Sequence, residues 1–260
     1  MNILEKIISD KRKEVELKKK LIPVKQLESS ALFYRPTHSL KKKLKEKISS
    51  GVIAEFKRRS PSKPIINNEL NVWDVAEIYK KAGVSGMSVL TDGKYFGGSL
   101  DDFLAARAAV DLPLLRKDFM IDEFQILEAK AHGADVILLI AAVLTRKEIE
   151  SLSQLAKSLG LEVFLEVHNR EELENSLMPS LDLIGINNRN LKTFETYIQT
   201  SLELADFIPS EFVKISESGI QSVQEIQELR KAGFQGFLIG ESFMKSNNLR
   251  EFTQEFVQNI

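Results

Sequence analysis

The sequence predicts an α/β protein, a (β/α)8 TIM barrel with an N-terminal helical extension, from three observations. Eight short apolar segments recur about every 26 residues. Helical patterns separate them, and several of the segments end on a charged or amide residue. In a barrel of parallel strands the apolar segments form the wall, and the chemistry takes place at the rim where the strands end.

The expected strands cover residues 52–57, 86–90, 112–117, 135–140, 161–166, 182–187, 212–217 and 236–240. Five of them end on residues that can ionise or form hydrogen bonds, namely Lys57, Lys117, Glu166, Asn187 and Glu217.

Helices are expected between these strands, most clearly over residues 71–82, 122–132, 145–159 and 222–232. Each of the four is followed by a glycine, which suits the left-handed position just after a helix. The third also opens with T-R-K-E, a capping-box pattern. Regular alternation of strand and helix favours a parallel sheet with right-handed crossovers.

Residues 1–50 do not follow this period. We expect an amphipathic helix over residues 2–20 and a lysine-rich helix over residues 39–48, the latter a solvated face or a patch that steers an anionic substrate. So short a stretch could bury little by itself, so residues 1–260 are expected to form one barrel domain with residues 1–50 as its extension.

Composition excludes several classes of function. The chain has 260 residues and no cysteine, which excludes disulfides and a thiol nucleophile. Its net charge of −1 gives no basic field for nucleic acid or anionic lipid. Neither a membrane-spanning run nor a signal peptide is visible, so we expect a cytoplasmic protein and, further, a monomer.

An open doubly wound sheet is the competing fold. It would usually show fewer strands in this length, and its first strand is often followed by a G-x-G-x-x-G turn. Here the first strand is followed by KRRSPSKP, which has no glycine, and the barrel is therefore favoured.

Charged residues are expected to converge at one end of the barrel. Because side chains alternate along a strand, Ile53, Glu55 and Lys57 share a face, as do Phe164 and Glu166. If these faces point inward, two lysines and three glutamates meet at one mouth. Such a set suits acid–base chemistry; the alternative is an ion-pair network that only closes the top of the core.

Two loops are candidates for binding phosphate. SESGI (216–220) and LIGES (238–242) follow the seventh and eighth strands, where such barrels often hold a phosphate with backbone N–H groups. They could also be ordinary turns, and Glu241 is an unusual neighbour for an anion.

The loop over residues 58–70 is a third candidate, because it offers donors for an anion; it could also be a merely polar surface loop. Those donors are Arg58, Arg59, Ser60, Ser62 and Lys63. The three histidines, His38, His132 and His168, show no metal-ligand spacing, so no metal site is expected.

Taken together, these segments resemble a known family, indole-3-glycerol phosphate synthase. The resemblance rests on IAEFKRRSPSKP, SVLTDGKYFGGS, LLRKDFMIDEFQILEAKAHGADVILLI, LEVFLEVHN, IGINNRNLKTF, SESGI and FLIGESFM. It runs from about residue 35 to residue 246, and its R-K-D-F-x-I-D-E-x-Q-I and E-x-K-x-x-S-P-S segments are long and specific.

The resemblance implies roles for individual residues. Lys117 would be the general acid, Glu166 an acid/base for loss of hydroxide, and Lys57 a ligand of the substrate's carboxylate region. Glu55, Asn187 and Glu217 would orient the lysines and hold hydroxyls. The implied substrate-binding residues are Arg189, the aromatic residues Phe96 and Phe119, and the phosphate-site residues Ser60, Ser218, Gly219, Gly240 and Glu241.

The implied reaction converts 1-(2-carboxyphenylamino)-1-deoxyribulose 5-phosphate to indole-3-glycerol phosphate by ring closure, decarboxylation and dehydration in tryptophan biosynthesis. It requires no cofactor, and the partner is a small phosphorylated molecule. Two alternatives remain. Phosphoribosylanthranilate isomerase relies on a cysteine, which this chain lacks. A non-catalytic phosphate-binding barrel would not need both lysines and Glu166 at strand ends.

Overall fold

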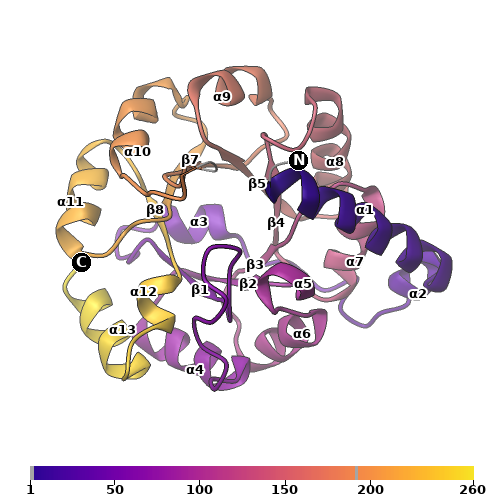
Figure 1. Ribbon diagram of the computed structural model, residues 1–260, viewed down its shortest axis with the longest axis horizontal. Helices are drawn as coiled ribbons and strands as arrows, with labels where there is room; N and C mark the ends of the chain where they lie inside the picture. The colour runs from indigo at the N-terminus through magenta and orange to yellow at the C-terminus, as the bar shows by residue number, and fades with distance from the viewer. Residues whose placement is uncertain (1–2, 191–192) are drawn as a thin grey trace.

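The computed structural model describes residues 3–190 and 193–260 and shows a closed barrel of eight parallel strands (Figure 1). Each strand pairs with the next along the chain, and the first pairs with the last, which closes the sheet. This confirms the predicted fold class. The strands are β1 (Val52–Phe56), β2 (Gly86–Leu90), β3 (Leu114–Lys117), β4 (Val136–Ile140), β5 (Glu162–Val167), β6 (Leu183–Asn187), β7 (Val213–Glu217) and β8 (Gly236–Ile239).

Helices surround the barrel and connect successive strands (Figure 1). The longer connecting helices are α4 (Val72–Ala82), α6 (Leu100–Ala109), α7 (Glu123–Ala131), α8 (Arg146–Ser158), α9 (Arg170–Ser176), α10 (Gln199–Leu204) and α11 (Val223–Lys231). Shorter or terminal elements are α1 (Ile3–Leu21), α2 (Val24–Glu28), α3 (Leu40–Lys45), α5 (Gly93–Phe96), the 3-10 helix η1 (Ala205–Phe207), α12 (Glu241–Met244) and α13 (Leu249–Gln258).

Local sequence signals set these boundaries. Thr145 and Ser222 each form a capping box, with Glu148 and Glu225, at the start of α8 and α11. The four glycines expected after helices all have positive φ, for example 82° at Gly83. Three predicted strand ends differ by one residue, since β1 stops at Phe56 and β8 at Ile239, whereas β5 continues to Val167; the third strand also begins at Leu114 and not at residue 112.

The barrel wall separates two apolar layers. Ile53, Leu115, Phe164 and Ile215 belong to one buried cluster inside the barrel, whereas their strand neighbours pack outward against the helices. The residues two positions further on, such as Glu55 and Glu217, therefore face the barrel axis. The predicted inward set is confirmed.

The N-terminal extension contacts both ends of the barrel. Leu40 and Leu44 of α3 join the interior cluster at the end where the strands begin, close to Gly86 and Gly236. Helix α1 lies at the opposite end, where the strands finish (Figure 1). The helix expected over 2–20 is present as α1, with Asn2 outside the described residues.

The second expected helix, over 39–48, is shorter than predicted. It stops at Lys45 because the backbone of Glu46 is extended, with ψ 139°, and the chain turns into β1 at Gly51. A side chain at Gly51 would meet the carbonyl oxygen of Gln235 at 2.7 Å. No helix in the described parts of the chain is long and apolar enough to cross a membrane.

Candidate active site

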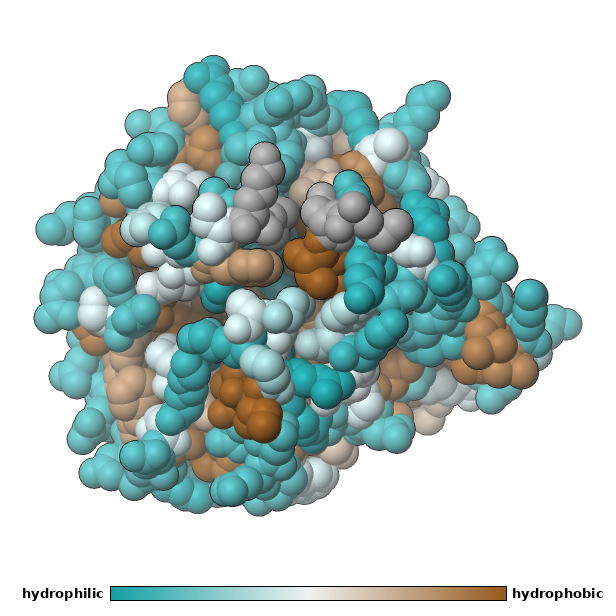
Figure 2. All heavy atoms as spheres, in the orientation of Figure 1, coloured by the Kyte–Doolittle hydropathy of each residue, from teal (hydrophilic) through white to brown (hydrophobic). Residues whose placement is uncertain are grey.

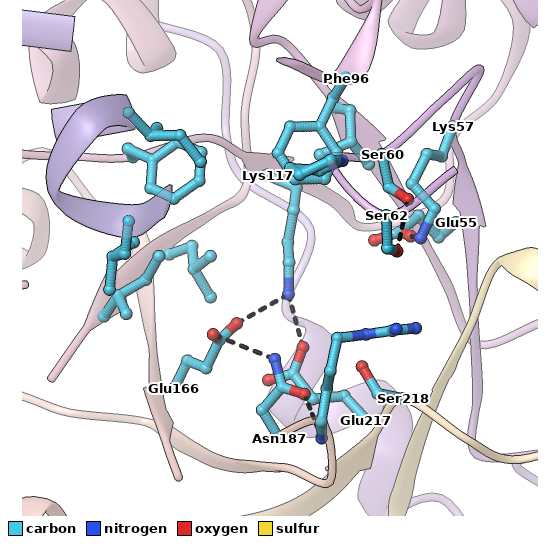
Figure 3. Close-up of a pocket in the computed structure, with 18 of the residues that line it drawn as sticks. Glu55, Lys57, Ser60, Ser62, Phe96, Lys117, Glu166, Asn187, Glu217 and Ser218 are labelled. Carbon is cyan, nitrogen blue, oxygen red and sulfur yellow. Dashed lines mark hydrogen bonds and ion pairs between the residues drawn. The ribbon is translucent and has the colours of Figure 1, made fainter. Parts of the chain in front are cut away.

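The predicted strand-tip residues meet at the mouth of the barrel. Figure 3 shows side chains from the ends of β1, β3, β5, β6 and β7 pointing toward one another. Figure 2 shows the same face, on which hydrophilic residues predominate and hydrophobic residues are also visible near the mouth. The residues brought together are Glu55, Lys57, Lys117, Glu166, Asn187 and Glu217.

Lys117 lies at the centre of this group. Its Nζ is 2.5 Å from Oε2 of Glu217 and 3.1 Å from Oε2 of Glu166. Burial disfavours the ammonium ion, but the charges of Glu217, Glu166 and Glu55 outweigh burial and raise the pKa of Lys117. The lysine is therefore a cation held between carboxylates at the floor of the pocket.

Glu217 is the carboxyl group most disfavoured as an anion. Burial and the neighbouring charge of Glu166 raise its pKa to about 7, although Lys117 opposes the shift. Its Oε1 has no hydrogen-bond partner among the described residues. A side chain at Gly185 would come within 2.9 Å of that atom, so glycine there leaves room for the carboxyl group.

Glu166 is held in its ionised form. Burial would raise its pKa, but Lys117, His168 and a hydrogen bond from Asn187 lower it. The amide of Asn187 donates to Oε1 over 3.1 Å and accepts from the backbone N–H of Arg189 over 3.0 Å. Of the two carboxyl groups beside Lys117, Glu217 rather than Glu166 is therefore the one whose surroundings favour the protonated form.

Lys57 forms a second ion pair. Its Nζ is 2.6 Å from Oε1 of Glu55, which is almost wholly buried. Thus the mouth holds two lysine–glutamate groups, one on each side. The alternative of an ion-pair network is correct in that these charges are paired, but the unpartnered oxygen of Glu217 and the adjoining pocket leave room for a ligand.

Apolar side chains form one wall of the pocket. Phe96 and Phe119 lie with ring centroids 6.0 Å apart, and Leu138 and Ile140 of β4 also line the pocket. Three residues of α1 also line this pocket, namely Ile3, Leu4 and Ile7. The arrangement suits a flat aromatic group beside the two lysines.

A second, more polar pocket adjoins the first. Ser218 and Gly219, both with positive φ, line it together with Gly240 and Glu241. Side chains at the two glycines would meet Thr196 and Glu55, respectively, within 3 Å. Ser60 does not line this pocket; it lies beside Phe96 in the first one, and its neighbours Ser62 and Lys63 reach the second.

Glu241 occupies the centre of a group of cations. Its carboxylate pairs with Lys63 and, over 2.8 Å, with Lys245, and it lies 3.9 Å from Arg189. Burial opposes these ion pairs, but together they lower its pKa to about 2. The carboxylate therefore stays charged at any ordinary pH.

Two predicted anion ligands face elsewhere. Arg58 pairs with Asp102 and donates to the carbonyl of Gly97, and Arg59 donates to the carbonyl of Gly93. Both arginines thus hold the 58–70 loop against α5 and α6. Both guanidinium groups bind acceptors of the protein itself, and the expectation that they offer donors to an anion stays a prediction.

Two contributors were missed by the sequence analysis. His168 lines the first pocket and lies two residues beyond Glu166. Lys11 of α1 is buried against Asp92 and Asp118. The period-2 pattern of β5 could have placed His168 inward, whereas no local pattern in the sequence marks Lys11 as the buried partner of two aspartates. No group of three or more His, Asp or Glu residues that could hold a metal occurs within 3–190 and 193–260.

Known proteins resemble this chain along its whole length. A profile of the indole-3-glycerol phosphate synthase family matches residues 4–256. The chain belongs to this family. An indole-3-glycerol phosphate synthase from Bacteroides thetaiotaomicron is 48% identical over 259 residues, covering 100% of this chain and 99% of the relative. One from Burkholderia ambifaria is 45% identical over 251 residues, 95% of each chain.

Membership of the indole-3-glycerol phosphate synthase family makes the chain an enzyme of tryptophan biosynthesis and a carboxy-lyase. Solved structures show the fold alone. Thiamine phosphate pyrophosphorylase from Pyrococcus furiosus aligns with a TM-score of 0.62 at 15% identity, over 85% of this chain and 97% of that one. KGPDC from Streptococcus mutans aligns with a TM-score of 0.61 at 10% identity, over 80% and 95%.

Proposed function

We propose that the mouth of the barrel binds 1-(2-carboxyphenylamino)-1-deoxyribulose 5-phosphate and closes its ring with Lys117 as the general acid. One observation carries the proposal: the Lys117 ammonium lies between Glu166 and Glu217, at the floor of a pocket walled by Phe96 and Phe119. A buried cation at this point can donate a proton to the ketone oxygen as the aromatic carbon attacks.

The second lysine serves the substrate's carboxylate. Lys57 lies at the edge shared by the two pockets, paired with Glu55. The substrate's carboxylate, placed beside Lys57, would replace Glu55 as the partner of the ammonium group until carbon dioxide leaves.

Dehydration falls to the glutamates. Glu166, aided by Asn187, gives a proton to the departing hydroxyl, and Glu217 holds Lys117 in place. The raised pKa of Glu217, about 7, lets it take or lose a proton near neutral pH. These steps are proton transfers to and from side chains, so the proposed mechanism calls for neither a metal nor an organic cofactor.

The substrate's phosphate is assigned to the second pocket. Backbone N–H groups of Gly219 and Gly240, with Ser218 and Arg189, would bind it. Ser60 would contribute only through the loop that carries Lys63. Glu241 is the unusual member, since a phosphate must share Lys63 and Lys245 with it.

We propose a single barrel domain that acts as a cytoplasmic monomer on a small phosphorylated molecule, without nucleic acid or membrane partners. The net charge of −1 supports the last point.

The test is turnover by Lys117→Ala, followed by the fluorescence change as the indole product forms. We expect kcat to fall by about 10²–10⁴-fold, the usual contribution of a general acid. Lys147→Ala, at an exposed position on α8, is the matched control and should behave as wild type. Activity of Lys117→Ala within a few-fold of wild type would remove Lys117 from the mechanism.

A further inference from the structure

His168 is buried beside the proposed acid and is fixed by a neighbouring carboxylate. It directly follows β5, and Oε2 of Glu172 lies 2.8 Å from its backbone nitrogen and 3.2 Å from its Nδ1. Glu172 is itself fixed, because its Oε1 accepts from Asn169, the residue that caps α9. The carboxylate therefore holds the imidazole ring with a proton on Nδ1.

The other ring nitrogen faces Glu166. Nε2 of His168 is 3.4 Å from Oε1 of Glu166 and has no hydrogen-bond partner among the described residues. With Nδ1 already a donor, a neutral ring would turn a bare nitrogen toward a bare carboxylate oxygen. The contact is favourable only when one proton lies between the two atoms, on either His168 or Glu166.

Charged and polar groups on every adjoining element determine whether that proton lies on His168 or on Glu166. Lys117 of β3 and Asn187 of β6 contact Glu166, whereas Glu172 of α9 and Glu217 of β7 bear on His168. Burial lowers the pKa of His168, but Glu172 and Glu166 raise it above its usual range, while the pKa of Glu166 is lowered. In the resting enzyme the proton therefore lies on His168.

This leaves the proposed acid without its proton. Glu166 must be protonated to help hydroxide leave, yet its surroundings favour the carboxylate. We propose that His168, held by Glu172, is a positioning residue that supplies Glu166 with the proton used in dehydration. This inference rests on the role proposed for Glu166.

During dehydration His168 gives up one proton and later regains it. The proton moves from Nε2 to Oε1 of Glu166 and then to the hydroxyl oxygen, which takes the electron pair of the breaking C–O bond and leaves as water. The neutral imidazole regains a proton from solvent. The substrate returns one proton to solvent as the aromatic ring forms.

The test compares His168→Gln with wild type. The glutamine amide can still donate a hydrogen bond to Glu166 but cannot release a proton near neutral pH. We expect kcat to fall by about tenfold or more, with KM changed by less than about threefold. The wild-type kcat should decline as pH rises through the pKa of His168, and this alkaline limb should be absent from the variant. His38→Gln, at an exposed histidine, is the control.

A second test measures the pKa of His168 in the folded enzyme and does not depend on catalytic activity. The pKa of His168, followed by the NMR chemical shifts of its ring, should fall when Glu166 is replaced by Gln, because the facing carboxylate is lost. An unchanged pKa, or a His168→Gln variant with the wild-type kcat and pH profile, would overturn the inference.

The two proposals fail in different ways. Wild-type activity in Glu166→Gln would overturn the role of Glu166 in the proposed function. An inactive Glu166→Gln beside a His168→Gln of normal kcat and pH profile would overturn only the role of His168.

Discussion

Replacing Glu217 with glutamine should stabilise the fold above neutral pH. The folded enzyme raises the pKa of this carboxyl group from 4.5 to about 7, so the folded chain binds a proton that the unfolded chain has lost. Stability from this group is fully present below pH 4.5 and is lost as pH rises through about 7. Glutamine resembles the protonated acid and keeps an oxygen for Lys117, so Glu217→Gln should not show this loss.

The size of the expected stabilisation follows from the shift in the pKa of Glu217. A difference from 4.5 to about 7, at about 1.4 kcal/mol per unit, makes the ionised group unfavourable by about 3 kcal/mol. Glu217→Gln should therefore match wild type near pH 4.5 and exceed its unfolding free energy by about 3 kcal/mol near pH 8. For a chain of this length that corresponds to a Tm higher by about 6–12 °C.

The assay is a thermal melt of wild type and variant at several pH values between about 4.5 and 8.5, with Glu211→Gln, an exposed glutamate just before β7, as control. The difference in Tm between Glu217→Gln and wild type should grow with pH. Parallel curves, or a variant less stable than wild type near pH 8, would show that the carboxylate of Glu217 is not disfavoured in the fold.

Other predictions concern the phosphate pocket, helix α1 and metals. Gly240→Val should lower the affinity for inorganic phosphate and also kcat, because the new side chain meets Glu55; unchanged calorimetric affinity would place the anion elsewhere. Glu241→Ser frees Lys63 and should strengthen phosphate binding about two- to fivefold at low salt; weaker binding would contradict this. Lys11→Ala removes the cation that pairs with buried Asp92 and leaves buried Asp118 with Arg116 and Thr91, so it should lower the unfolding free energy by about 3–5 kcal/mol in urea melts, against the exposed Lys147→Ala. EDTA should leave the turnover rate unchanged, and activity lost in EDTA and restored by a divalent ion would refute the cofactor-free mechanism.

Most of the fold could be predicted because its signals are local. Apolar runs mark the strands, capping residues such as Thr145 begin helices, and glycines such as Gly83 end them. Alternation along each strand then places Glu55 and Glu217 at the mouth. These features depend on neighbours in sequence, so the chain reports them directly.

The ion pairs and protonation states of the site could not be predicted, because they depend on contacts between distant segments. Arg58 is as basic as Lys63, yet it is bound to Asp102, which only the packing of α6 decides. The protonation of Glu166 and Glu217 likewise depends on which of them lies nearer to other carboxylates and donors. Both are glutamates at strand tips, and composition alone does not distinguish them.

The position of α3 has a consequence for the order of folding. The helix is made early in synthesis, but it packs into the barrel beside β7, and its Leu44 lies close to Gly236 of β8. β1 also needs β8 to complete its hydrogen bonds. Until the last strand leaves the ribosome, Leu40 and Leu44 have no complete site to fill, and the first strand is an open edge. We therefore expect the nascent chain to be vulnerable to aggregation until nearly all of it has emerged.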